Sequence, residues 1–146
     1  MRIAIANDHG GFNVKWKIIA FLKEEGYTVD NFGSDKSIPC DYPDFGIPAA
    51  RSVARSVNDR AILICSNGIG MSILSNKISG IVGALVYNDS AAVNTRKHHD
   101  SNVLCLGGKE FSDEKLLGFV KLWLNTEFEG GRHERRMNKI KQLELK

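Results

Sequence analysis

Residues 61–72 read AILICSNGIGMS, and this stretch predicts the fold class of the chain. Its unbroken apolar run is typical of a strand that is buried on both faces, as in a parallel sheet. The run ends on Cys65 and passes directly into a loop with glycines at 68 and 70, where a helix is expected to begin. A buried strand, a glycine loop and a helix in direct succession indicate a βα unit.

The same alternation recurs along the chain. Further strands are expected at 2–6, 27–31, 81–87 and 102–108, and helices at 12–25, 47–57, 90–98, 112–125 and 132–143, with DYPDFG at 41–46 in a loop. Strands joined by helices of this length imply a mostly parallel sheet that is covered on both faces. We expect one domain that spans all 146 residues.

Composition excludes several classes of protein. The formal net charge is only +3, so a nucleic-acid partner is not expected, and the basic excess at 130–142 favours a small anionic ligand. No segment approaches the roughly 18 apolar residues of a membrane span. The start of the chain lacks the pattern of a secretory signal, and the three cysteines form no disulfide or metal pattern. We therefore expect a cytoplasmic protein with free thiols.

The segment 130–146 differs from the other helical stretches. Two glycines lead into it, and it carries an apolar strip of Met137, Ile140 and Leu143 or Leu145. Such a terminal helix is expected to pack on a partner subunit. The alternative is that it folds back on its own domain.

The loop after Cys65 is a candidate site, because right-handed crossovers place every strand-to-helix loop at the carboxyl edge of the sheet. A thiol beside a helix start ionises readily and acts as a base or nucleophile; the alternative is a buried cysteine that behaves as a small hydrophobe. Ile73 occupies the place of the third glycine of a dinucleotide fingerprint, and no P-loop lysine follows. The loop amides are still able to hold an oxyanion, unless the loop is only a tight turn.

Two other pairs of residues point to a phosphorylated sugar. Asp8 and His9 follow the first strand and suit a sugar hydroxyl and a phosphate, or else they are a helix cap and an exposed histidine. Arg132 and Arg136 are four residues apart on one helix face and are able to grip a phosphate, although many such clusters are simply solvated.

His98 and His99 are adjacent, so on a helix their side chains point about 100° apart and do not share a metal ion. One of them is a candidate acid or base near neutral pH. The alternative is that both interact with the helix dipole.

Taken together, five stretches resemble the ribose-5-phosphate isomerase B family, which includes the galactose-6-phosphate isomerase subunits. They are NDHGG at 7–11, DYPD at 41–44, ILICSNGIGMSILSNK at 62–77, HHDSNVLCLGGK at 98–109 and FEGGRHERR at 128–136. The resemblance implies a Rossmann-like three-layer α/β/α sandwich, with a five-stranded parallel sheet and an additional C-terminal helix. It also implies homodimers or tetramers with active sites at the subunit interface.

The implied activity is an aldose–ketose isomerisation through an enediolate, without a metal or other cofactor. Ribose 5-phosphate and ribulose 5-phosphate are the expected pair. A six-carbon substrate such as allose or galactose 6-phosphate, or a non-catalytic sugar-phosphate binding module, remain alternatives.

The resemblance assigns roles to individual residues. Cys65 matches the catalytic base, His98 the ring-opening histidine and Tyr42 a site tyrosine, while Asn67 helps to steady the oxyanion. The substrate-binding residues are then Asp8, His9, Ser66, Gly68, Gly70, His99, Lys109, Arg132, His133 and Arg136, with the arginines supplied by the neighbouring subunit. Ser66, Asn67, His99 and Lys109 depart from the residues common in the family, which leaves the preferred sugar open.

Overall fold

The computed structural model describes residues 1–145. Its strands are β1 (Arg2–Asn7), β2 (Thr28–Asn31), β3 (Arg60–Cys65), β4 (Gly83–Leu85) and β5 (Val103–Gly107). Its helices are α1 (Phe12–Glu24), α2 (Tyr42–Ala54), α3 (Ile69–Ser75), α4 (Asp89–His99), α5 (Asp113–Leu124) and α6 (Arg132–Lys141), with short 3-10 turns η1 (His9–Gly11) and η2 (Gln142–Leu145). All strand pairs are parallel, in the order β2-β1-β3-β5-β4. The predicted α/β class with a five-stranded parallel sheet is confirmed.

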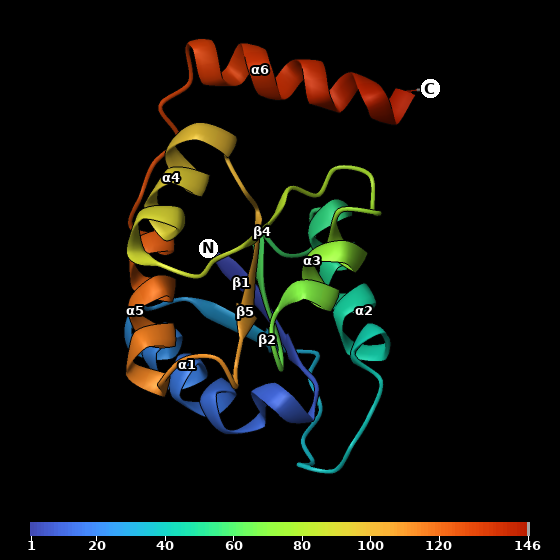
Figure 1. Ribbon diagram of the computed structural model, residues 1–146, viewed down its shortest axis with the longest axis vertical. Coiled ribbons are helices and arrows are strands. Elements are labelled where there is room, and N and C mark those ends of the chain that lie inside the picture. The colour runs from blue at the N-terminus through green and yellow to red at the C-terminus, as the bar shows by residue number, and fades with distance from the viewer. Residues whose placement is uncertain (146) are drawn as a thin grey trace.

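Two helical layers enclose the sheet (Figure 1). Residues of β3 alternate between them: Ile62 and Ile64 pack in the cluster with α1, α4 and α5, whereas Ala61, Leu63 and Cys65 pack in the cluster with α2 and α3. Both sets are fully or almost fully buried. Burial on both faces explains why the strand reads as a continuous apolar run.

The strand order creates a crevice at the carboxyl end of the sheet. β1 and β3 are neighbours, yet the helix that follows β1 lies in one layer and the helix that follows β3 lies in the other. Ligands of open α/β sheets bind at such a switch point. Asp8 and Cys65 stand there, at the ends of these two strands.

Two expected elements have different bounds. α2 begins at Tyr42, so the expected loop DYPDFG forms the end of a loop and the first helical turns. Pro43 occupies the first turn, where a missing N–H disrupts no helical hydrogen bond. The expected strand at 81–87 shortens to β4 (Gly83–Leu85), because β4 pairs only with β5 at the edge of the sheet.

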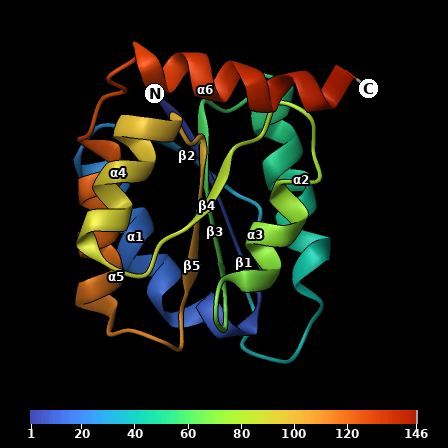
Figure 2. The same cartoon turned by 45° about the horizontal axis from the view of Figure 1, so that its top comes forward.

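α6 lies across the amino edge of its own sheet (Figure 2). Glu144 anchors this end of the chain, because its carboxylate accepts hydrogen bonds from Ser79 Oγ at 2.9 Å and from the Gly80 amide at 3.1 Å. Met137 is buried, whereas Ile140 and Leu143 are exposed. One face of α6 thus folds back on its own domain, and contact with a partner subunit stays a prediction. Within residues 1–145, no helix combines the length and apolar character needed to cross a membrane.

Candidate active site

Cys65 ends β3 with its side chain turned toward the following loop. Only 4 % of the residue is exposed, and its Sγ accepts a hydrogen bond from the Gly68 amide at 3.2 Å. Gly68 has a φ of +81°, and a Cβ there would lie 2.7 Å from Leu85 Cδ1. Glycine is therefore required for the loop to aim its amide at the sulfur.

A cavity of about 370 Å³ opens beside this sulfur. We call it the carboxyl-edge cavity; it is lined by Asp8, Tyr42, Cys65, Ser66, Asn67, Ile69, Gly70 and Ile73. Six residues of this lining were predicted to be catalytic or substrate-binding. They are Asp8, Tyr42, Cys65, Ser66, Asn67 and Gly70.

Asp8 and Tyr42 reach the carboxyl-edge cavity from two other elements. Asp8 caps η1, because its Oδ1 accepts a hydrogen bond from the Gly10 amide at 2.7 Å. Asp8 therefore has the expected capping role and also lines the cavity. The Tyr42 ring packs against Gly70, where a Cβ would lie 2.5 Å from Tyr42 Cζ.

The other residues predicted at this edge lie around the cavity. His9 Nδ1 accepts a hydrogen bond from the Cys40 amide at 3.3 Å. Asn67 Oδ1 accepts one from the Ile69 amide at 3.0 Å, so this side chain stabilises the start of α3. The Lys109 amide donates to the Ser66 carbonyl at 3.0 Å.

The remaining predicted residues form a second group, the amino-edge cluster, made of His98, His99, Arg132, His133 and Arg136. The rings of His98 and His133 stack with centroids 4.2 Å apart and planes at 14°. His133 is buried, whereas both arginines are exposed at the start of α6. The stacked rings therefore join the end of α4 to the helix that carries the arginines.

Burial, followed by the charge of Arg132, lowers the pKa of His133. Burial, followed by the neighbouring His98, lowers the pKa of His99. The lowered pKa values favour the neutral form of both imidazoles at pH 7, whereas Arg132 and Arg136 are positively charged.

One arrangement has the composition of a metal site but not its geometry. One ligand atom from each of His98, Glu129 and His133 lies within 4.8 Å of the others. The two rings are nearly parallel and stacked, so their in-plane nitrogen lone pairs do not converge on one point. Lys97 Nζ also lies 3.8 Å from the Glu129 carboxylate. These three residues therefore lack the convergent ligand geometry that a divalent cation requires.

The two groups of predicted residues lie at opposite edges of the sheet. His98 and His99 end α4, just before β5 starts, whereas Gly107 at the far end of β5 pairs with Cys65. β5 has five residues, so its ends are about 13 Å apart at roughly 3.3 Å per residue. The fold of one chain separates His98 and the arginines from the sulfur.

Sequence reasoning missed three residues at these sites. Ile69 and Ile73 line the carboxyl-edge cavity and are exposed; their spacing of four at a helix start was the available signal. Glu129 lies 3.6 Å from His133 Nε2, and its amide donates to the Lys97 carbonyl. Its only signal was its place inside the stretch FEGGRHERR.

Comparison with known proteins agrees with this geometry. The Ribose/Galactose Isomerase family matches residues 3–140. Ribose-5-phosphate isomerase B of Escherichia coli is 38 % identical over 143 residues, which cover 98 % of this chain and 96 % of that protein.

Two solved structures have the same fold. Ribose-5-phosphate isomerase B of Clostridium thermocellum is 43 % identical, with a TM-score of 0.96 and coverage of 99 % of this chain and 98 % of the other. The Mycoplasma genitalium enzyme, with ribulose 5-phosphate bound, is 37 % identical, with a TM-score of 0.95 and coverage of 99 % and 97 %. The match extends from β1 to α6, and the chain belongs to the Ribose/Galactose Isomerase family.

Proposed function

We propose that this protein interconverts ribose 5-phosphate and ribulose 5-phosphate in the cytoplasm, with Cys65 as the base. The observation that carries the proposal is the position of the sulfur, which borders the carboxyl-edge cavity at the switch point and accepts a hydrogen bond from the Gly68 amide. Membership of the family supports the same reaction.

The reaction is a proton transfer between two carbons of the open-chain sugar. The Cys65 thiolate removes the proton from C2, and the C–H electron pair forms the C1–C2 double bond while negative charge passes to the carbonyl oxygen on C1. Cys65 then returns the proton to C1, and the proton of the C2 hydroxyl passes to the oxygen on C1, which becomes a hydroxyl as the C2 carbonyl forms. Donors near the cavity, such as the Tyr42 hydroxyl and the Asn67 amide, are placed to stabilise the charge that develops on oxygen.

The phosphate would be held by a second copy of the chain. Arg132 and Arg136 are exposed and lie at the opposite edge of the sheet from Cys65. A homodimer with two-fold symmetry would place the amino-edge cluster of each subunit over the carboxyl-edge cavity of its partner. His98 of the partner subunit would then open the sugar ring.

A turnover panel tests the reaction. We expect the protein to isomerise ribose 5-phosphate faster than allose 6-phosphate and galactose 6-phosphate, and equally well with and without a chelator. Cys65→Ala should lower kcat by about 10²–10⁴-fold, the usual contribution of a general base. Cys40→Ser is the matched control, because Cys40 meets His9 only through its backbone amide.

Three results would contradict the proposal. Faster turnover of a six-carbon phosphate would move the substrate to the alternative class. Near-normal turnover by Cys65→Ala would remove Cys65 as the base, and binding without turnover of any of these sugars would indicate a binding module.

A further inference from the structure

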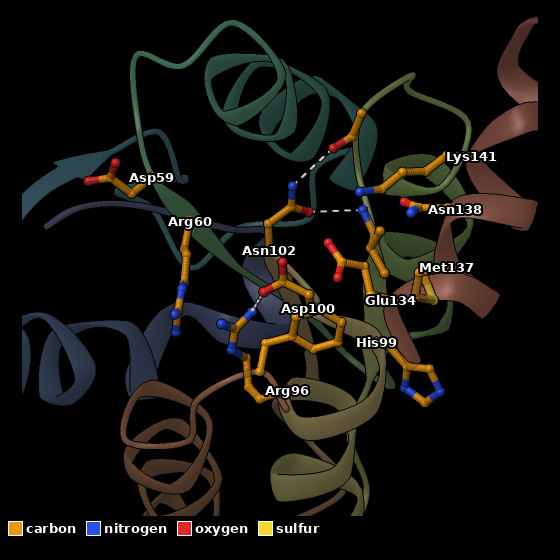
Figure 3. A pocket seen from close by; sticks show the side chains of 13 residues that line it. Asp59, Arg60, Arg96, His99, Asp100, Asn102, Glu134, Met137, Asn138 and Lys141 are labelled. Atoms are coloured by element: carbon orange, nitrogen blue, oxygen red, sulfur yellow. Dashed lines mark hydrogen bonds and ion pairs between the residues drawn. The ribbon is translucent and has the colours of Figure 1, made fainter. Parts of the chain in front are cut away.

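A second cavity, of about 360 Å³, lies beneath α6 at the amino edge of the sheet (Figure 3). We call it the α6 cavity. Arg60 at the start of β3, Arg96 and Asp100 at the end of α4, and Asn138 and Lys141 of α6 are among the residues that line it. None of the residues that line the carboxyl-edge cavity contributes to it.

The α6 cavity shares His99 with the amino-edge cluster but neither of the two predicted phosphate-binding arginines. Glu134, Asn138 and Lys141 line it and follow one another at spacings of four and three, so they share one face of α6. Arg132 and Arg136 lie on the opposite face of the helix, since positions two residues away from this series point about 200° away. A ligand in the α6 cavity would therefore contact the back of the helix.

Arg60 is the unusual group in this cavity. A guanidinium carries five N–H donors, yet none of those of Arg60 forms a hydrogen bond or ion pair within residues 1–145, and Nη1 is fully buried. Its one notable partner is the face of Trp123, whose ring centroid lies 5.2 Å from Cζ. Burial, followed by the charge of Arg96, lowers the pKa of Arg60 to about 10. Buried donors of this strength ordinarily have an acceptor.

The nearby carboxylates do not supply that acceptor. Asp100 is paired with Arg96 at 2.8 Å, and Asp59 accepts a hydrogen bond from the Arg2 amide at 2.7 Å. Among the described residues, the charged groups of the cavity left without an ion pair are Arg60 and Lys141, which are cationic, and Asp59 and Glu134, which are anionic. The buried Nη1 of Arg60 thus has no acceptor among residues 1–145, although Asp59 and Glu134 border the same cavity.

We propose that the α6 cavity binds a small oxyanion, the phosphate or carboxylate group of a metabolite, between the guanidinium groups of Arg60 and Arg96. Figure 3 shows these two side chains next to each other, with Asn138 and Lys141 across the cavity. The Arg60 guanidinium is suited to bidentate contact with either anion. Arg96 already donates from Nη1 to the Ser101 carbonyl and from Nε to the Thr126 carbonyl, so it adds its charge and Nη2. The ligand would supply Arg60 with the acceptor that the protein does not provide.

Trp123 offers a direct optical test, because Arg60 lies over its ring. The chain has two tryptophans, so Trp16→Phe leaves Trp123 as the sole indole. Inorganic phosphate and citrate are titrated separately into this full-length variant, with sodium chloride at matched ionic strength as the control for screening. We expect a saturable change in Trp123 emission with at least one of the two anions, and the stronger of the two identifies the ligand group.

Two further variants in the Trp16→Phe background locate the response. Arg60→Met should weaken the apparent affinity at least tenfold, and Arg60→Lys should restore part of it, because lysine keeps the charge but not the planar fork. Arg136→Ala should leave the response unchanged, since that residue belongs to the separate surface of α6. The proposal is overturned if neither anion gives a saturable response beyond that of sodium chloride. It is equally overturned if Arg60→Met binds as tightly as its parent, or if Arg136→Ala abolishes the signal.

Discussion

Gly70 contacts Tyr42 at the carboxyl-edge cavity, and only glycine, which has a hydrogen atom in place of a Cβ, leaves room for the tyrosine ring. A Cβ at position 70 would lie 2.5 Å from Tyr42 Cζ and 2.8 Å from Tyr42 Oη. The Gly70→Ala substitution must therefore displace the phenol ring, which borders the cavity. A displacement of about 1 Å in an active site lowers the rate by about 10²-fold, and we expect a fall in kcat/KM for ribose 5-phosphate of that order.

The control for this prediction is Gly118→Ala in α5. A Cβ at position 118 meets nothing within 4 Å, so this helical position should gain about 0.5–1 kcal/mol in the free energy of unfolding. Its kcat/KM should equal that of the wild type. Full activity in Gly70→Ala would show that the position of the Tyr42 ring is irrelevant to turnover.

At the scale of elements, the loop between β2 and α2 is held by a buried ammonium group. Lys15 is fully buried on α1, and its Nζ donates to the Ser34 carbonyl at 2.6 Å and to Asp35 Oδ1 at 3.0 Å. The same loop supplies the Cys40 amide that bonds His9. Lys15→Met keeps the length of the side chain but removes both bonds. We expect a loss of about 1–3 kcal/mol in the free energy of unfolding, measured by urea denaturation.

Lys17→Met is the matched control on the same helix. Lys17 is largely exposed and pairs with Asp113 at 2.8 Å, and exposed pairs contribute about 0–1 kcal/mol. Hydrogen exchange separates a local effect from a global one: the Cys40 amide should exchange faster in Lys15→Met and at the wild-type rate in Lys17→Met. Equal losses of stability in the two variants would argue against Lys15 as the anchor of the loop.

An element could be predicted accurately where its own sequence pattern determines its bounds. β3 and β5 were predicted within a residue or two, because burial on both faces leaves a continuous apolar run. The predicted start of α2 was wrong, since DYPDFG at 41–46 was interpreted as a loop although Pro43 fits the first helical turn. β4 was predicted too long, because an apolar run does not reveal that an edge strand has only one neighbour to limit its pairing.

In the candidate site, too, residues placed by local sequence could be predicted, whereas contacts between distant parts of the chain could not. Cys65 and Asp8 could be placed at the carboxyl edge from topology alone, since each directly follows a strand. The stacking of His133 on His98 joins residues 35 positions apart, and no local pattern reports such a contact. Glu129 and Arg60 owe their environments to tertiary packing in the same way, so the α6 cavity could not be inferred from the sequence.

At the scale of the whole molecule, the sheet separates two incomplete groups of functional residues. One chain presents a thiol and a cavity at one edge, and two exposed arginines and a histidine pair at the other. Exposed apolar side chains accompany both groups, with Ile69 and Ile73 beside the cavity and Ile140 and Leu143 on and after α6. A symmetric pair of chains would cover these side chains and complete two sites at once.

Subunit complementation tests this arrangement. Cys65→Ala and the double variant Arg132→Ala/Arg136→Ala should each be nearly inactive as pure proteins. When equal amounts are unfolded and refolded together, half of the dimers are mixed, and in each mixed dimer one of the two sites has an intact Cys65 and intact arginines from different chains. The mixture should then recover about a quarter of the wild-type kcat, with light scattering confirming the dimer. If each site were built within one chain, every chain in the mixture would carry a defect and no activity would return.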